Sequence, residues 1–114
     1  MNYTPDRWVI IEVDSIAGKH RKVLGSWYGG YLGSDSYRVS SGITKVVDRR
    51  KHYEIENESG SVYICYKGAE GMSSLTSGVY KKYKKDLKDQ KLGTIKIIKD
   101  VKVIDEKNKG TKMS

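Results

Sequence analysis

The sequence of 114 residues contains no phenylalanine, one proline, one cysteine and two tryptophans. Its nine tyrosines must therefore supply most of the aromatic packing, and each buried hydroxyl needs a hydrogen-bond partner. The single cysteine, Cys65, excludes an intramolecular disulfide. One cysteine and two histidines are also too few for the common structural zinc sites. We therefore expect no metal and no cofactor.

Long apolar runs are also absent. No stretch approaches the roughly 18 apolar residues of a membrane-spanning helix. The N-terminus MNYTPDRWVIIEV lacks the basic flank and long apolar segment of a secretory signal. With no disulfide possible, these absences predict a cytoplasmic protein in a reducing compartment, with no membrane partner.

Arginine is missing from the C-terminal third, although the chain carries a net charge of +8. Residues 1–79 hold ten Lys and Arg against nine Asp and Glu, whereas residues 80–114 hold twelve Lys against five acids. The basic character therefore belongs to the C-terminal third and is made of lysine alone. Because arginine is the better planar, bidentate reader of bases and phosphates, this bias weakens a nucleic-acid hypothesis without excluding it.

Hydrophobic alternation predicts a mainly β chain between residues 7 and 67. Turn signals separate short runs of β-branched and aromatic residues, which we assign as strands at 7–13, 21–28, 36–40, 43–47, 52–57 and 61–67. A break or bulge is expected at Ser41-Gly42. These strands are expected to form an antiparallel meander.

The pattern changes to a helical period near residue 73. Lysines surround an apolar stripe that repeats every four residues, namely Leu75, Val79, Tyr83 and Leu87. This arrangement predicts an amphipathic helix at about 73–91, ended by Gly93. We expect its apolar stripe to pack on Val62 and Ile64 or their neighbours.

The predicted fold class is α+β and mainly β. We expect a curved antiparallel sheet or small β-barrel of six to seven strands, one C-terminal amphipathic helix, and a closing strand at 94–104 that covers a sheet edge. Residues 1–104 are expected to form a single β-rich domain. Residues 105–114 are expected to form a flexible basic tail.

The stretch GSWYGGYLGSDSYR at 25–38 combines four glycines, one tryptophan, three tyrosines and a closing arginine. Its glycine spacing fits neither the dinucleotide motif nor the P-loop, so we expect the glycines to serve a turn. Neighbouring strand residues face opposite sides, so Trp27 and Tyr28 cannot both be buried by a one-sided sheet. Because burial of the larger ring removes more apolar area, we predict a partner-binding patch of Tyr28, Tyr31 and Arg38, supported by a partly buried Trp27.

No catalytic set emerges from the remaining reactive residues. Cys65 lies mid-strand and is expected to be a buried, inert thiol. His20 and His52 have no serine or carboxylate at a recognised catalytic spacing, and Glu54 and Glu56 fit a solvated strand face. We therefore predict no catalytic residue and no enzyme.

The segment YKKYKKDLKDQK at 80–91 is the strongest electrostatic feature. Its lysines are interleaved with tyrosines, so Lys81, Lys82 and Lys85 are candidate phosphate contacts for a nucleic acid. A solvated outer helix face is the alternative interpretation.

Three segments resemble a group of small proteins carried by tailed bacteriophages that has no assigned activity. The segments are DRWVIIEV at 6–13, GSWYGGYLGSDSYRVSSGI at 25–43 and SGSVYICYK at 59–67, and the resemblance covers about residues 6–80. The resemblance implies an accessory gene product made in the cytoplasm of an infected bacterial cell. Such proteins often bind and inhibit host factors, including defence systems.

Three functional hypotheses follow. The leading one is a non-enzymatic phage-type binding protein that engages a host macromolecule and inhibits host defence or nucleic-acid metabolism. The second is a direct nucleic-acid-binding protein that uses the lysine-rich helix and the tyrosine-rich sheet. The third is a sponge for a small signalling nucleotide, which needs a concave pocket with stacked rings. The sequence leaves the oligomeric state open.

Overall fold

The computed structural model describes residues 1–101 of the chain. Within that range the chain forms eight β-strands, one α-helix and two short 3-10 turns. The basic tail predicted at 105–114, and the end of the strand predicted at 94–104, lie outside the described residues. The helix-and-strand content confirms the prediction of a mainly β fold with one helix followed by a strand.

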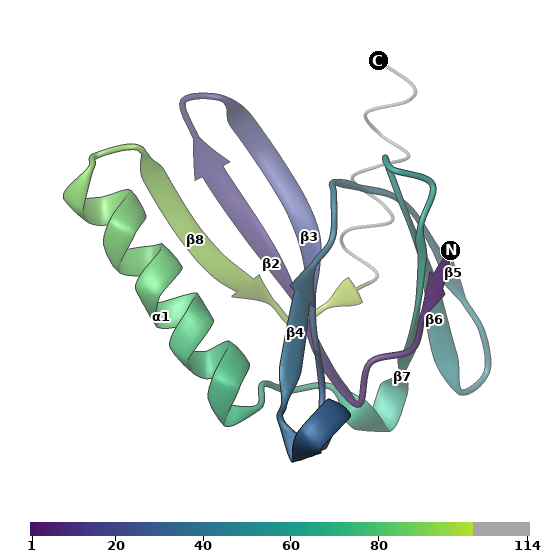
Figure 1. The fold of residues 1–114 in the computed structure, drawn as a ribbon. Helices are drawn as coiled ribbons and strands as arrows, with labels where there is room; N and C mark the ends of the chain where they lie inside the picture. Colours follow the sequence, from purple (N-terminus) through teal and green to yellow (C-terminus); the bar gives the residue numbers. More distant parts are fainter. Residues whose placement is uncertain (102–114) are drawn as a thin grey trace.

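The strands form two four-stranded sheets (Figure 1). The first sheet is antiparallel, and its order is β4 (Ser36–Val39), β3 (Gly18–Trp27), β2 (Arg7–Ser15) and β8 (Gly93–Ile98). The order of the second is β1 (Asn2–Tyr3), β7 (Val62–Tyr66), β6 (His52–Asn57) and β5 (Ile43–Asp48). Among the strands of residues 1–101, only β1 pairs in parallel, with β7, and an isolated parallel bridge also joins Trp8 to Glu70. The described residues thus form curved open sheets rather than a closed barrel.

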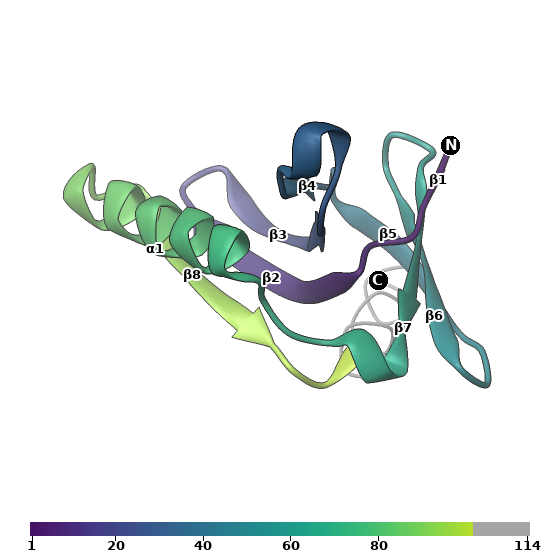
Figure 2. The ribbon, with the colours of Figure 1, turned by 60° about the horizontal axis from the view of Figure 1, so that its bottom comes forward.

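Strand β2 is buried on both faces, which makes the fold three layers deep (Figure 2). Trp8 and Ile10 face the second sheet and share a core with Ile55, Tyr63 and Cys65. The alternate residues of β2 face the helix and form a second core, with members Val9, Ile11, Val13, Leu24, Leu87 and Ile95. A strand covered on both faces reads as a continuous apolar run, as WVII does here.

Helix α1 (Ser74–Asp89) lies along the first sheet, where it contacts β8, β3 and β4. Our prediction that it would pack on Val62 and Ile64 was wrong, because β7 belongs to the other sheet. The helix begins at a capping box: the Ser73 side chain accepts from the Thr76 backbone N–H, and the Thr76 hydroxyl accepts from the Ser73 N–H. Of its predicted apolar stripe, Leu87 is buried and the other three residues are half-buried.

The predicted break at Ser41-Gly42 is the point where the chain leaves the first sheet for the second. Ser40 is buried there; its hydroxyl accepts from the Val23 N–H at 2.8 Å and donates to the Ser41 carbonyl at 2.7 Å. A Cβ at Gly42 would lie 2.7 Å from the Glu58 carboxylate, so a larger residue at the crossing would displace the end of that exposed side chain. The expected meander is thus split into two sheets at this crossing.

Candidate functional site

The aromatic stretch at 25–38 forms the end of β3, a tight connection and strand β4. Gly29 and Gly33 have φ values of 60° and 76°, the left-handed region that glycine favours, as expected for turn glycines. Leu32 between them also has a positive φ, 61°, and its side chain is 87% exposed. Leu32 therefore presents its side chain to solvent from a backbone conformation that non-glycine residues rarely adopt.

Trp27 and Tyr28 divide between the interior and the surface as ring size predicted. Trp27 is half-buried, and its indole N–H donates to the Thr4 carbonyl at 3.0 Å. Tyr28 is 50% exposed, and its backbone N–H donates to the Asp6 carboxylate at 2.8 Å. Tyr31 begins the 3-10 turn η1 (Tyr31–Gly33), and its side chain lies outside the described part of the molecule.

Tyr3 joins the predicted residues Trp27 and Arg38 into one cluster. The Arg38 guanidinium carbon lies 4.6 Å from the centre of the Tyr3 ring, a cation–π contact. Tyr3 also meets Trp27 edge to face at 6.3 Å and Tyr63 at 5.0 Å, measured between ring centres. Burial raises the pKa of Tyr63, and the neighbouring Arg38 charge offsets part of that rise. The cluster therefore holds the Arg38 side chain at a defined place between the two sheets.

The sequence analysis missed Tyr3 and Tyr63 as members of this cluster. Tyr3 is positioned by the two-residue strand β1, which places it beside Tyr63 on β7. The chain then passes over β3, where Pro5 lies 3.0 Å from the position of a Cβ at Gly25. A parallel strand of two residues is too short to show a periodic pattern in the sequence. Pro5 and Gly25 were the available signals that the backbone before β2 passes close to β3.

Two hollows flank Arg38. A shallow one of about 280 Å³ is lined by Tyr3, Trp27, Ser36, Tyr37 and Arg38. A larger one of about 360 Å³ lies deeper between the sheets and is rich in hydroxyls; its lining includes Tyr3, Arg38, Ser40, Ser41, Ser59, Ser61 and Tyr63. A nucleotide sponge needs open ring faces for stacking. Arg38 already covers one face of Tyr3, which makes these hollows poorly suited to a stacked base.

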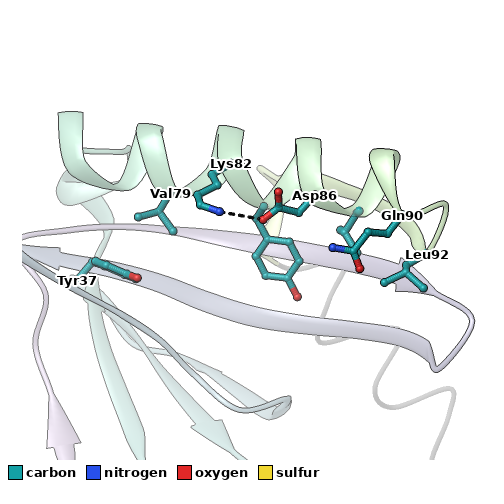
Figure 3. Close-up of a pocket in the computed structure, with 8 residues that line it drawn as sticks. Tyr37, Val79, Lys82, Asp86, Gln90 and Leu92 are labelled. Carbon is teal, nitrogen blue, oxygen red and sulfur yellow. Dashed lines mark hydrogen bonds and ion pairs between the residues drawn. The ribbon is translucent and has the colours of Figure 1, made fainter.

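An apolar groove of about 350 Å³ runs between α1 and the first sheet (Figure 3). Its apolar lining comes from both sides, namely Tyr37, Val79, Tyr83, Leu87 and Leu92. Its rim is polar: Lys82 and Asp86 form an ion pair at 3.2 Å, and Gln90 follows one turn later. The lining thus joins residues of α1 to Tyr37 of β4 and to Leu92, which follows the helix.

Strand β4 is the wall shared by the groove and the aromatic cluster. Tyr37 lines both the groove and the shallow hollow, and Arg38, its neighbour, contacts Tyr3. We call Tyr3, Trp27, Tyr37 and Arg38 the β4 surface. Tyr37 is 47% exposed, so a large ring is displayed on the groove side of this surface.

The predicted nucleic-acid contacts Lys81, Lys82 and Lys85 are all exposed on α1. Residues 74–89 carry five lysines and two aspartates, a net charge of +3. Lys82 is partly neutralised because it pairs with Asp86 on the groove rim. The structure thus places these lysines on one solvated helix, next to the β4 surface but separate from it.

The remaining reactive side chains are either buried or engaged in hydrogen bonds with their neighbours. Cys65 is fully buried, and burial raises the pKa of its thiol well above the usual range, as expected for an inert cysteine. Glu54 accepts from Arg49 and contacts His52, and these hydrogen bonds hold its pKa below the usual value.

Within residues 1–101, no three His, Cys, Asp or Glu side chains gather in a metal-binding arrangement. None of the described helices is long and apolar enough to cross a membrane.

One buried carboxylate lies outside these sites. Glu12 on β2 is 2% exposed and pairs with cross-strand neighbours on both sides, Arg21 at 2.8 Å and Lys96 at 3.2 Å. No residue of the described part of the chain donates a hydrogen bond to Glu12 Oε1, so Arg21 acts there through its charge. Burial raises the pKa of Glu12, but the Lys96 hydrogen bond and the charges of Arg21 and Lys96 outweigh it and leave the pKa lowered. This triad stabilises the far end of the first sheet.

Comparison with known proteins gives no match. No protein-family profile, no curated protein and no solved structure matches the chain.

Proposed function

We propose that this chain is a small, non-enzymatic binding protein of bacteriophage type that engages a host protein through the β4 surface. The observation that carries the proposal is the display of aromatic side chains and one arginine around a short edge strand. Tyr28 and Tyr37 expose about half of their area, and Arg38 lies between Tyr3 and the solvent-open hollow. By inhibiting its partner, the protein would interfere with host defence or with nucleic-acid metabolism in the cytoplasm of the infected cell.

The residue types at the β4 surface support binding to a protein. Tryptophan, tyrosine and arginine are the side chains that most often dominate the energy of protein interfaces. Arg38 is held by its contact with Tyr3, so its guanidinium edge can meet a carboxylate with little further loss of side-chain freedom. The half-buried Trp27 supports the cluster from beneath. The resemblance to small phage proteins supports a host partner.

Capture from a bacterial lysate tests this proposal. Tagged wild-type protein, Arg38→Glu and Arg50→Glu would each be incubated with nuclease-treated lysate, and bound proteins would be quantified by mass spectrometry. Arg50 is exposed on the β5–β6 turn, so it controls for the same change of charge elsewhere. We expect a specific protein to be retained by wild type and Arg50→Glu and lost from Arg38→Glu. Equal retention by all three would contradict the proposal.

Direct nucleic-acid binding is the second candidate, favoured by the exposed lysines of α1. Lysine contacts with phosphate would give sequence-independent binding that falls steeply with salt. In the lysate experiment this function predicts that nuclease treatment removes every bound protein.

A further inference from the structure

We infer that the open edge of β4 accepts an extended segment of the partner as an added strand, and that this segment alternates apolar and acidic side chains. This inference rests on the proposed function and specifies its mode. In strand addition, backbone hydrogen bonds to a sheet edge give affinity, and pockets for alternate side chains give specificity. Both elements are present at β4.

The outer edge of β4 is unpaired. The strand bonds to β3 on one side and to no other described strand. The Asp6 N–H donates to the Ser26 carbonyl at 2.8 Å, so the backbone groups of Ser26 point away from β4. Ser26 is opposite Tyr37, and alternation in an antiparallel pair then directs the N–H and C=O of Tyr37 outward.

Val39, two residues further on, repeats the orientation of Tyr37. The Ser40 N–H donates to the Val23 carbonyl at 2.9 Å, so the backbone N–H of Ser40 faces β3. By alternation, the backbone N–H and C=O of Val39 face outward. No described residue occupies a hydrogen-bonding position on the outward groups of Tyr37 and Val39. The edge therefore offers two N–H donors and two carbonyl acceptors at the spacing of an added strand.

The two faces beside this edge differ in chemistry. The Tyr37 face opens on the apolar groove, with Val79 of α1 across it (Figure 3). Tyr83 of α1 also lines this groove. The opposite face carries Arg38 over Tyr3, and no carboxylate in the described chain pairs with this arginine. Residues of an added strand point alternately to these two faces, so apolar side chains suit the first and acidic side chains the second.

Charge agrees with this occupant. The net charge of +3 on residues 74–89 favours an acidic segment over a basic one.

Synthetic peptides test the inference directly. The probe is a nine-residue peptide in which glutamate alternates with valine and leucine, titrated into isotope-labelled protein and followed by NMR. We expect chemical-shift changes centred on β4 and at least tenfold slower hydrogen exchange at the Tyr37 and Val39 amides. A peptide of the same composition with its glutamates in one block should bind at least tenfold more weakly. Two further peptides carry N-methyl groups on either the odd or the even amides. Only one of them should bind, because in an added strand only alternate N–H groups face β4.

A matched pair of variants isolates the backbone contact. Val39→Pro removes the outward N–H but keeps Tyr37 and Arg38, and edge strands tolerate proline where the N–H faces solvent. Val39→Ala loses the same side-chain packing but keeps the N–H. We expect Val39→Pro to weaken peptide binding at least tenfold relative to Val39→Ala. Circular dichroism and the amide spectrum show whether each variant is folded.

Several outcomes would overturn strand addition. These are equal affinity for the alternating and block peptides, equal affinity of the two N-methylated peptides, equal affinity of the two Val39 variants, or protection confined to α1. A dimer that protects the β4 amides without peptide would assign the edge to a second copy of the chain. If the lysate partner is lost from Arg38→Glu but retained by Val39→Pro, the proposed function stands and strand addition fails.

Discussion

The guanidinium carbon of Arg38 lies 4.6 Å above the ring of Tyr3, so residues 35 positions apart in the chain join the two sheets at one point. Arg38 belongs to the first sheet and Tyr3 to the second. The contact fixes the arginine on the face of β4 opposite the groove that Tyr37 lines, so this short edge strand presents an ordered arginine on one face and an exposed ring on the other. The predictions below test the core, the buried charge, the thiol, the lysine helix and this surface in turn.

Leu87→Ala should destabilise the fold by about 2 kcal/mol, near the low end for a leucine-to-alanine change in a core. Leu87 is 8% exposed and belongs to the core between α1 and the first sheet, but it also lines the groove. The space left by its side chain would open to solvent rather than form a closed cavity. Urea unfolding measures the change. Unaltered stability would contradict the packing of α1 on this sheet.

Glu12→Gln should reduce the free energy of unfolding at pH 7 by roughly 1 kcal/mol, because it leaves Arg21 and the largely exposed Lys96 without their shared carboxylate. The folded pKa of Glu12 is lowered, so its stabilising contribution is present above the unfolded pKa and lost as pH falls through the folded pKa. The difference between wild type and Glu12→Gln should therefore shrink below about pH 4.5. Urea unfolding from pH 7 to pH 3 measures it. A difference that does not change with pH would contradict the ion-pair account.

Cys65 should not react with a thiol reagent in the native protein. It has no exposed area, and burial raises the pKa of its thiol, so little thiolate forms. A colorimetric disulfide reagent should modify it at the rate of unfolding and at once in denaturant. Rapid modification of the native protein would show an accessible nucleophile, contrary to the expected inert role.

The fold was largely predictable because its strands alternate and its helix repeats every four residues. The predicted helix at 73–91 is α1 at Ser74–Asp89, and each strand predicted between 7 and 67 has a counterpart. The division into two sheets was not predictable, because period-2 patterns show which residues are buried but not which strands pair. The WVII run carried a missed signal: apolar residues on both faces of β2 indicate a strand covered from both sides.

The candidate site was predictable only in part. Trp27 and Arg38, which belong to the β4 surface, were predicted because they flank an aromatic, glycine-rich turn. Tyr37 was passed over although it belongs to the same stretch, since strand alternation alone does not show which face lies beside a groove. Tyr3 depended on a long-range parallel pairing that no local pattern encodes.

The triple change of Lys81, Lys82 and Lys85 to glutamate tests the nucleic-acid hypothesis. If these lysines contact phosphates, binding to random-sequence DNA should weaken, and the slope of log affinity against log salt should fall by about 2 to 3. Fluorescence anisotropy at several salt concentrations measures both. The matched control reverses three exposed cations away from α1, namely Lys45, Arg50 and Lys51. Equal effects of the two triple variants would show that the α1 lysines act only through the net charge of the protein and do not contact phosphates.

The affinity of the captured host protein for β4-surface variants tests the central claim most directly. Isothermal titration would compare wild type with Tyr37→Ala and Arg38→Ala, and with Arg50→Ala as a control distant from the surface. If the β4 surface is the binding site, each of the first two changes should weaken binding by about 30-fold, the effect of a 2 kcal/mol hot spot, with thermal stability retained. The control should bind like wild type. Affinities of both variants within twofold of wild type would place the binding surface elsewhere.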